Sequence, residues 1–117
     1  EEYVYFGIPA TQPEAQHTYW KHDHNRRISA GIACRLLFNA DTPKETMKNR
    51  NGYKGCDARY MPQGIITPSF ILVYKDTTVI FVQSPQAIAV EIINQAIADS
   101  FMAYFEMFWK RSTKFNK

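Results

Sequence analysis

The chain has 117 residues, of which 45% are hydrophobic and 15% aromatic, and its formal net charge is +3. This length fits one domain with a single hydrophobic core, and the composition excludes an intrinsically disordered chain. No apolar run approaches the ~20 residues of a membrane-spanning helix, and the start does not resemble a signal peptide, so we expect a cytoplasmic protein.

The first half of the chain alternates strands with helices. Residues 3–9 form a short apolar run closed by a proline, which predicts a buried strand. A helix is expected over residues 11–30, because Thr11 can cap its start and a glycine follows its end. Residues 34–39 predict a second strand, and a proline then opens a short helix over about residues 43–49.

The second half consists of strands and one long helix. Residues 57–62 predict a third, more exposed strand. The strongest β signal is a hairpin with strands over residues 69–74 and 79–83. A further strand over residues 87–92 and a final helix over 94–111 complete the order β-α-β-α-β-β-β-β-α. This order predicts one α/β domain with a mixed β-sheet flanked by helices.

The final helix has more apolar surface than one core-facing side requires. One stripe of its apolar residues follows helical spacing, and further large apolar residues lie off that stripe. The alternatives are a protein partner and a helix buried deep in its own core. We expect a partner, because a self-complementary helix face makes a twofold homodimer. The candidate interface residues are Phe101, Tyr104, Phe105, Phe108 and Trp109.

Basic residues gather in two parts of the sequence. One group comprises Lys44, Lys48, Arg50 and Lys54. The other comprises Lys110, Arg111, Lys114 and Lys117. Two solvated surfaces are the preferred interpretation, and a phosphate-binding patch is the alternative.

The residue pattern predicts neither a metal site nor a cofactor site. On a helix, His22 and His24 point about 200° apart, and His17 lies about 10 Å from His24 along the axis. One ion needs its donors at about 2 Å, so this helix alone cannot chelate a metal. Cys34 and Cys56 form no CxxC pair and are expected to be small buried thiols. The chain also lacks a glycine-rich phosphate loop and a GxSxG nucleophile motif.

Several stretches, in this order and spacing, resemble a known family. They are Phe6-Gly7-Ile8-Pro9, Tyr19-Trp20-Lys21, His24, Arg26-Arg27, Gly31-Ile32, Arg35-Leu36-Leu37-Phe38-Asn39, Arg59-Tyr60-Met61-Pro62, Thr67-Pro68-Ser69, Ile97-Ala98-Asp99-Ser100-Phe101, Tyr104-Phe105-Glu106 and Trp109-Lys110. The chain resembles, over nearly its whole length, the phospholipase D-like domain that follows the winged helix in TrmB-type transcription regulators, which are mostly archaeal. The implied fold is a phospholipase D-like sandwich over residues 1–117, cut from a longer regulator.

The resemblance also implies that the catalytic residues are missing. In active phospholipase D-like enzymes, an HxK pair on a β-hairpin precedes an Asp, the His attacks phosphorus, and the Lys stabilises charge. Thr67, Ser69 and Tyr74 stand at these positions here. None of them can perform the corresponding role, so the resemblance implies that the chain is not an enzyme.

The implied function is a non-catalytic dimerisation and effector-sensing domain of a DNA-binding regulator. Its partners would be a second copy of the chain, a small-molecule effector, and DNA through a separate winged-helix domain, with no membrane contact. The candidate effector-binding residues are Trp20, His24, Arg27, Thr67, Ser69 and Tyr74, for which a structural role is the alternative. The alternative function is a divergent phosphodiesterase or nuclease of the same superfamily that uses His22 or His24 as its nucleophile.

Overall fold

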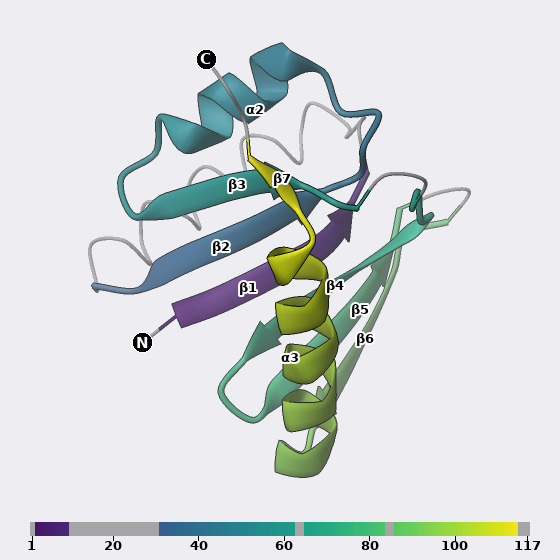
Figure 1. Ribbon diagram of the computed structural model, residues 1–117. Coiled ribbons are helices and arrows are strands. Elements are labelled where there is room, and N and C mark those ends of the chain that lie inside the picture. Colours follow the sequence, from purple (N-terminus) through teal and green to yellow (C-terminus); the bar gives the residue numbers. More distant parts are fainter. Residues whose placement is uncertain (1, 10–30, 63–64, 84–85, 115–117) are drawn as a thin grey trace.

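The computed structural model describes residues 2–9, 31–62, 65–83 and 86–114, which form a seven-stranded sheet and two helices (Figure 1). The helix predicted over residues 11–30 lies outside the described residues. The elements are β1 (Glu2–Ile8), β2 (Ala33–Phe38), α2 (Lys44–Asn51), β3 (Cys56–Tyr60), β4 (Ser69–Tyr74), β5 (Thr77–Val82), β6 (Ile88–Ile93), α3 (Gln95–Lys110) and β7 (Thr113–Lys114).

The sheet is mixed, as the sequence predicted, with the strand order β6-β5-β4-β1-β2-β3-β7. Strands β1, β2 and β3 are parallel, whereas β4, β5, β6 and β7 pair with their neighbours in antiparallel fashion. The carboxyl ends of β1, β2 and β3 therefore lie at the edge of the sheet where β4 begins (Figure 1). One row of paired residues crosses five strands through Ile71, Phe6, Leu37, Arg59 and Lys114.

The central strand β1 lies between β2 and β4 in the sheet, and the side chains on both of its faces are buried. Its alternating side chains divide between the two cores. A register shift at Gly7, whose φ is +77°, interrupts the alternation, so Ile8 joins the same core as Tyr3 and Tyr5. Val4 and Phe6 belong to the opposite core.

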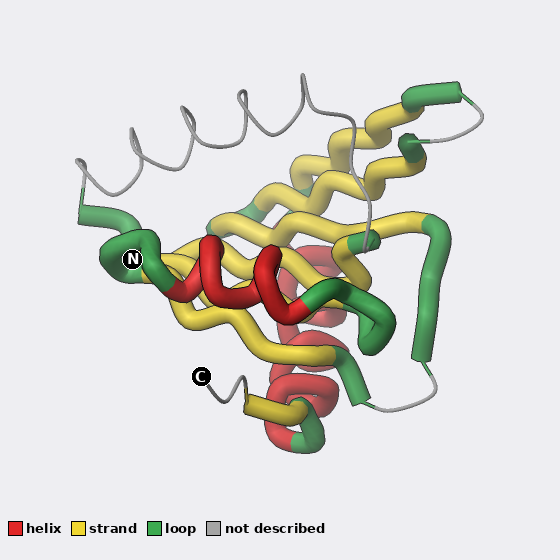
Figure 2. The backbone as a smooth tube through the Cα atoms, turned by 90° about the horizontal axis from the view of Figure 1, so that it is seen from above, coloured by secondary structure: helices red, strands yellow, loops and turns green. Residues whose placement is uncertain are grey.

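The two described helices pack against opposite faces of the sheet (Figure 2). Met47 of α2 is buried in the core that contains Tyr3 and Tyr5. Phe105 of α3 is buried in the core that contains Val4 and Phe6, and its ring centroid lies 5.9 Å from that of Phe6. Neither described helix has the length and hydrophobicity that crossing a membrane requires.

Helix α3 begins where the sequence predicted. The side-chain oxygen of Asn94 accepts a hydrogen bond from the backbone N–H of Ile97 at 3.0 Å and so caps the first turn. Only Ala98 and Phe105 of this helix are fully buried, because its other residues lie at the margins of the sheet or face away from it.

Arg35 of β2 joins three elements on the α3 face of the sheet. Its guanidinium donates to Glu2 of β1 and to Glu106 of α3, each at 2.7 Å, and lies over the rings of Phe105 and Trp109. Burial disfavours the charged form, but the hydrogen bonds to the two carboxylates outweigh this effect and raise the pKa of Arg35. The guanidinium therefore stays charged and ties the last turns of α3 to β1 and β2.

The described elements confirm the predicted order and reveal two differences. The hairpin between β4 and β5 is tighter than expected, because Thr77 and Thr78 belong to β5 and pair with Tyr74 and Val73. Lys75 makes this short turn possible with a φ of +55°. The second difference is β7, which the sequence did not predict and which pairs with β3 after the end of α3.

The first prediction concerns the buried ring of α3. Phe105→Ala should lower the free energy of unfolding by about 3–5 kcal/mol, because it removes a fully buried ring and leaves a cavity against β1. Tyr104→Ala is the matched control, since Tyr104 is 51% exposed, and it should change the value by about 0.5 kcal/mol or less. Urea denaturation measures both, and equal losses would contradict the assigned packing.

Candidate functional site

The carboxyl edge of the parallel strands is the natural place for a site. In open α/β sheets, ligands bind outside the carboxyl ends of the strands, where the strand order changes direction. Here that point lies at β1, whose neighbours are β2 on one side and the antiparallel β4 on the other. The polar side chains at this edge are Asn39, directly after β2, and Thr67 and Ser69 around the start of β4.

Asn39 organises the backbone at this edge. Its side chain is almost completely buried, with 2% exposed. The amide nitrogen donates to the carbonyl of Thr67 at 3.0 Å, and the backbone N–H of Thr67 donates to the amide oxygen at 3.4 Å. The backbone N–H of Asn39 also donates to the carbonyl of Ile8 at 2.8 Å. One residue thus holds the ends of β1 and β2 against the segment that leads into β4.

The Thr67 hydroxyl is packed against the bulge of β1. Its oxygen lies 3.0 Å from the carbonyl of Ser69 and 3.3 Å from that of Gly7, either of which can accept its proton. A Cβ on Gly7 would lie only 2.6 Å from this hydroxyl oxygen. The hydroxyl therefore serves the junction between β1 and β4 and is directed at the backbone.

The structure describes three of the six predicted effector-binding residues, and these three do not lie together. Thr67 and Ser69 lie together, whereas Tyr74 lies at the other end of β4, about 16 Å away along the strand. Tyr74 packs against the core that contains Met47 of α2. Ser69 lies on the other face of the strand, together with Ile71, which packs against the core beneath α3. Trp20, His24 and Arg27 lie outside the described residues, as do His17 and His22.

The predicted dimer residues occupy very different environments. Phe105 is 0% exposed, so no partner can contact it, and its assignment to an interface is wrong. Phe101, Phe108 and Trp109 are partly buried and pack against the α3-side core. Of this set, Tyr104 has the greatest exposure. The homodimer itself stays a prediction, as do the effector and the contact with DNA through a winged helix.

Sequence reasoning missed the role of two arginines around Trp109. The guanidinium of Arg59 lies 4.0 Å from the ring centroid of Trp109, and that of Arg35 lies 5.2 Å from it. Phe105 stacks on the same indole at 5.6 Å. The alternation of β2 and β3 could have placed both arginines on one face, but the sequence contains no signal for their approach to α3.

The two cysteines are neighbours across β2 and β3. Cys34 and Cys56 are register partners, and neither forms a disulfide. A hydrogen bond with Cys34, together with burial, raises the pKa of Cys56. Its thiol is therefore a poor nucleophile at neutral pH. Cys34 is buried, as predicted, whereas Cys56 is half-buried. In the described part of the chain, no group of three or more His, Cys, Asp or Glu side chains could hold a metal ion.

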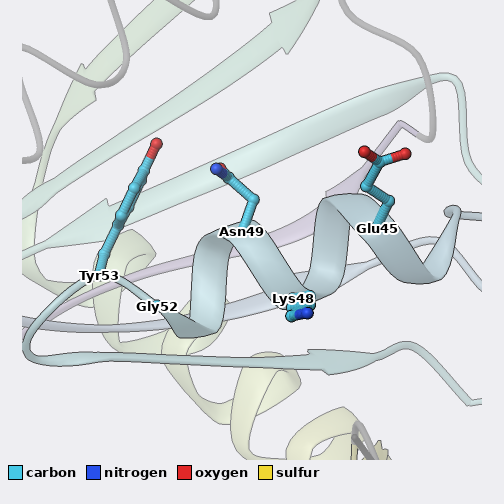
Figure 3. Close-up of a pocket in the computed structure, with 5 residues that line it drawn as sticks. All are labelled: Glu45, Lys48, Asn49, Gly52 and Tyr53. Atoms are coloured by element: carbon cyan, nitrogen blue, oxygen red, sulfur yellow. The ribbon is translucent and has the colours of Figure 1, made fainter.

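A shallow depression lies on the outer surface of α2. It is lined by Glu45, Lys48, Asn49, Gly52 and Tyr53 (Figure 3). The side chains of Glu45, Asn49 and Tyr53 extend side by side from the helix and do not point toward one another (Figure 3). The depression shares no residue with the carboxyl edge and offers no cationic clamp for a phosphate.

Comparison with known proteins concerns the fold. No family model matches the sequence, and no curated protein matches it. Among solved structures, NucT from Helicobacter pylori is similar with a TM-score of 0.70 and 8% sequence identity, over 97% of this chain and 82% of that chain. NucT is a nuclease of the phospholipase D-like superfamily. The fold is phospholipase D-like. No comparison supports a TrmB-type or archaeal regulator.

This likeness corrects the function expected from the sequence. A non-catalytic regulator domain, and with it the statement that the chain is not an enzyme, is wrong by this comparison, because the structural neighbour is a nuclease. The finding favours the alternative of a divergent phosphodiesterase or nuclease. At 8% identity the similarity shows the fold alone, so the activity is a proposal.

Asn39 gives the first test of this edge. Asn39→Ala should lower the free energy of unfolding by about 1–3 kcal/mol, because it removes a buried amide and leaves the half-buried backbone N–H and carbonyl of Thr67 without their side-chain partner. Asn49→Ala, an exposed change on α2, is the control and should alter the value by about 0.5 kcal/mol or less. Thermal or urea unfolding measures both variants, and an unchanged Asn39→Ala protein would contradict the assigned role.

Gly7 and Thr67 give a second, coupled test. Gly7→Ala should destabilise the protein by about 1–2 kcal/mol from its left-handed backbone alone, and by more because of the approach to Thr67. In a Thr67→Ala background the same change should cost less, with a coupling energy of about 0.5 kcal/mol or more. A double-mutant cycle by urea denaturation measures the coupling, and strictly additive losses would refute the contact.

Proposed function

We propose that the chain is a divergent phosphodiesterase or nuclease of the phospholipase D-like superfamily, with the helix-flanked sandwich typical of that superfamily. The observation that supports it best is the structural likeness to NucT, which extends over most of both chains. We place the proposed active site at the carboxyl edge around Asn39 and Thr67, because the resemblance found in the sequence puts Thr67 and Ser69 at the positions of the catalytic pair.

The nucleophile of such an enzyme has to come from another part of the chain. Thr67 and Ser69 replace the His and Lys of the HxK pair, and the Thr67 hydroxyl is directed at backbone carbonyls. A hydroxyl without an adjacent base is a weak nucleophile. In the parts of the chain that the structure describes, there is no histidine. We therefore assign the nucleophile to His22 or His24, which lie outside them and are followed by Arg26 and Arg27 in the sequence.

The proposed reaction proceeds in two displacements. An imidazole nitrogen attacks phosphorus, the P–O bond to the leaving group breaks, and the departing alkoxide takes up a proton from solvent. Water then attacks the phosphohistidine, the P–N bond breaks and the water gives up a proton to solvent, which releases a phosphomonoester and restores the imidazole. Cationic side chains near the phosphate stabilise the charge that develops in both steps.

The test compares three histidine variants with the parent protein. One of His22→Ala and His24→Ala should lower kcat for a single-stranded oligonucleotide, or for bis(p-nitrophenyl) phosphate, by about 100-fold or more. His17→Ala removes the same side chain from the same region and is the matched control. The phosphohistidine should be trapped in the parent by rapid acid-free quenching and detected by mass spectrometry.

Two results would overturn the proposal. One is the absence of turnover by a folded parent protein on either substrate. The other is turnover that neither His22→Ala nor His24→Ala reduces, because the chain then lacks the imidazole nucleophile that we assign.

A further inference from the structure

Cationic side chains gather where α3 ends beside β3 and β7. The strand β7 pairs with the last residues of β3, directly after the end of α3 (Figure 1). This pairing places Arg59 and Lys114 next to each other, with Lys110 and Arg111 at the end of the helix. Lys110, Arg111 and Lys114 are exposed, whereas the Arg59 side chain is about four-fifths covered.

The pairing of Arg59 with Lys114 is unfavourable for the isolated domain. The two residues are register partners in an antiparallel pair, so their side chains leave the same face of the sheet close together. Like charges in such positions repel each other, which costs stability unless an anion lies between them. The only carboxylate paired with this group among the described residues is Asp57, at 3.3 Å from Arg59.

Arg35 provides an internal contrast on the same face. Its guanidinium is bound by the carboxylates of Glu2 and Glu106 at 2.7 Å, so its charge is fully compensated within the fold. Across the described residues, Lys110, Arg111 and Lys114 form no ion pair with any carboxylate. The carboxylates of the fold therefore neutralise Arg35, which supports α3, whereas the cations at and after the end of α3 are available to a ligand.

The cationic group lies on a line with the candidate site. Arg59 and Lys114 belong to the row of paired residues that continues through Leu37 and Phe6 to Ile71. Ser69 lies two residues from Ile71, toward the carboxyl edge and on the same face. Three strand spacings separate β4 from β3, which is about 14 Å. Phosphates advance about 3.4 Å along each strand of a duplex, so a few nucleotides can extend from one to the other.

We propose that the exposed cations Lys110, Arg111 and Lys114, beside Arg59, bind the phosphate backbone of a nucleic acid strand whose neighbouring segment lies at the carboxyl edge of the sheet. The inference rests on the proposed function and names its substrate class as nucleic acid. The group binds phosphates and not bases, because the ring of Trp109 already contacts Phe105 and two arginines of the fold. Binding is therefore independent of sequence and depends strongly on salt.

The test is a charge reversal with a matched control. The protein binds a fluorescein-labelled single-stranded 20-mer, and anisotropy gives Kd at several KCl concentrations. Arg111→Glu with Lys114→Glu should raise Kd at least about tenfold and reduce the slope of log K against log salt by about 1.4, or about 0.7 for each cation removed. Lys44→Glu with Lys48→Glu changes the net charge equally on α2, and should leave Kd within about twofold near 0.15 M salt, where the Debye length is about 8 Å.

The outcomes separate this inference from the proposed function. Equal weakening in both double variants, no binding of the 20-mer by the folded parent, or binding only to phosphatidylserine vesicles would each overturn the inference. Turnover is measured on the same samples. If the parent protein binds the 20-mer through Arg111 and Lys114 but does not hydrolyse it, only the proposed function is contradicted. If the protein hydrolyses the substrate through a histidine, but the Arg111→Glu and Lys114→Glu changes leave binding unchanged, only the inference is contradicted.

Discussion

The burial of β1 on both of its faces is the constraint on which the rest of the structure depends. A strand with apolar side chains on both sides needs a covering layer on each, and α2 and α3 provide them. The bulge at Gly7 then shifts the register at the carboxyl end. It brings the β1 backbone against Thr67, and Asn39 connects the same point to β2. The architecture of the core thus determines where a substrate could meet polar groups.

The carboxyl edge and the described side chains give different indications about function. The fold is similar to that of a nuclease, but the Thr67 hydroxyl, at the position of the catalytic His, is hydrogen-bonded to the backbone of the fold. This half-buried hydroxyl cannot also act as a nucleophile without disturbing the junction that it holds. If the chain hydrolyses phosphodiesters, its imidazole and its cations must therefore approach this edge from elements other than the hairpin. The uncompensated charges near β7 are consistent with that division of roles.

The sequence predicted most of the described elements, because alternation and helical spacing reflect the same burial that the structure shows. It missed β7, since two residues following a helix contain no periodic signal. It also assigned Phe105 to an interface, because a broad apolar helix does not reveal which of its residues the sheet covers. Among the candidate effector residues that the structure describes, Tyr74 lies apart from Thr67 and Ser69 for a geometric reason. Tyr74 and Ser69 are close in sequence, but an extended strand places them at opposite ends and on opposite faces.

The location of the residues behind the family resemblance explains why it predicted the fold better than the function. Phe6, Leu37 and Phe105 are buried together, and Asn39 and Thr67 hold the edge of the sheet. Such positions are constrained by packing in this fold, and packing does not determine what the protein binds or cleaves. Groups that act on a ligand are exposed or lie at the edge, where this chain has Arg111 and Lys114. Evidence for the proposed nuclease activity therefore has to come from those exposed charges and from the histidines, and not from the core.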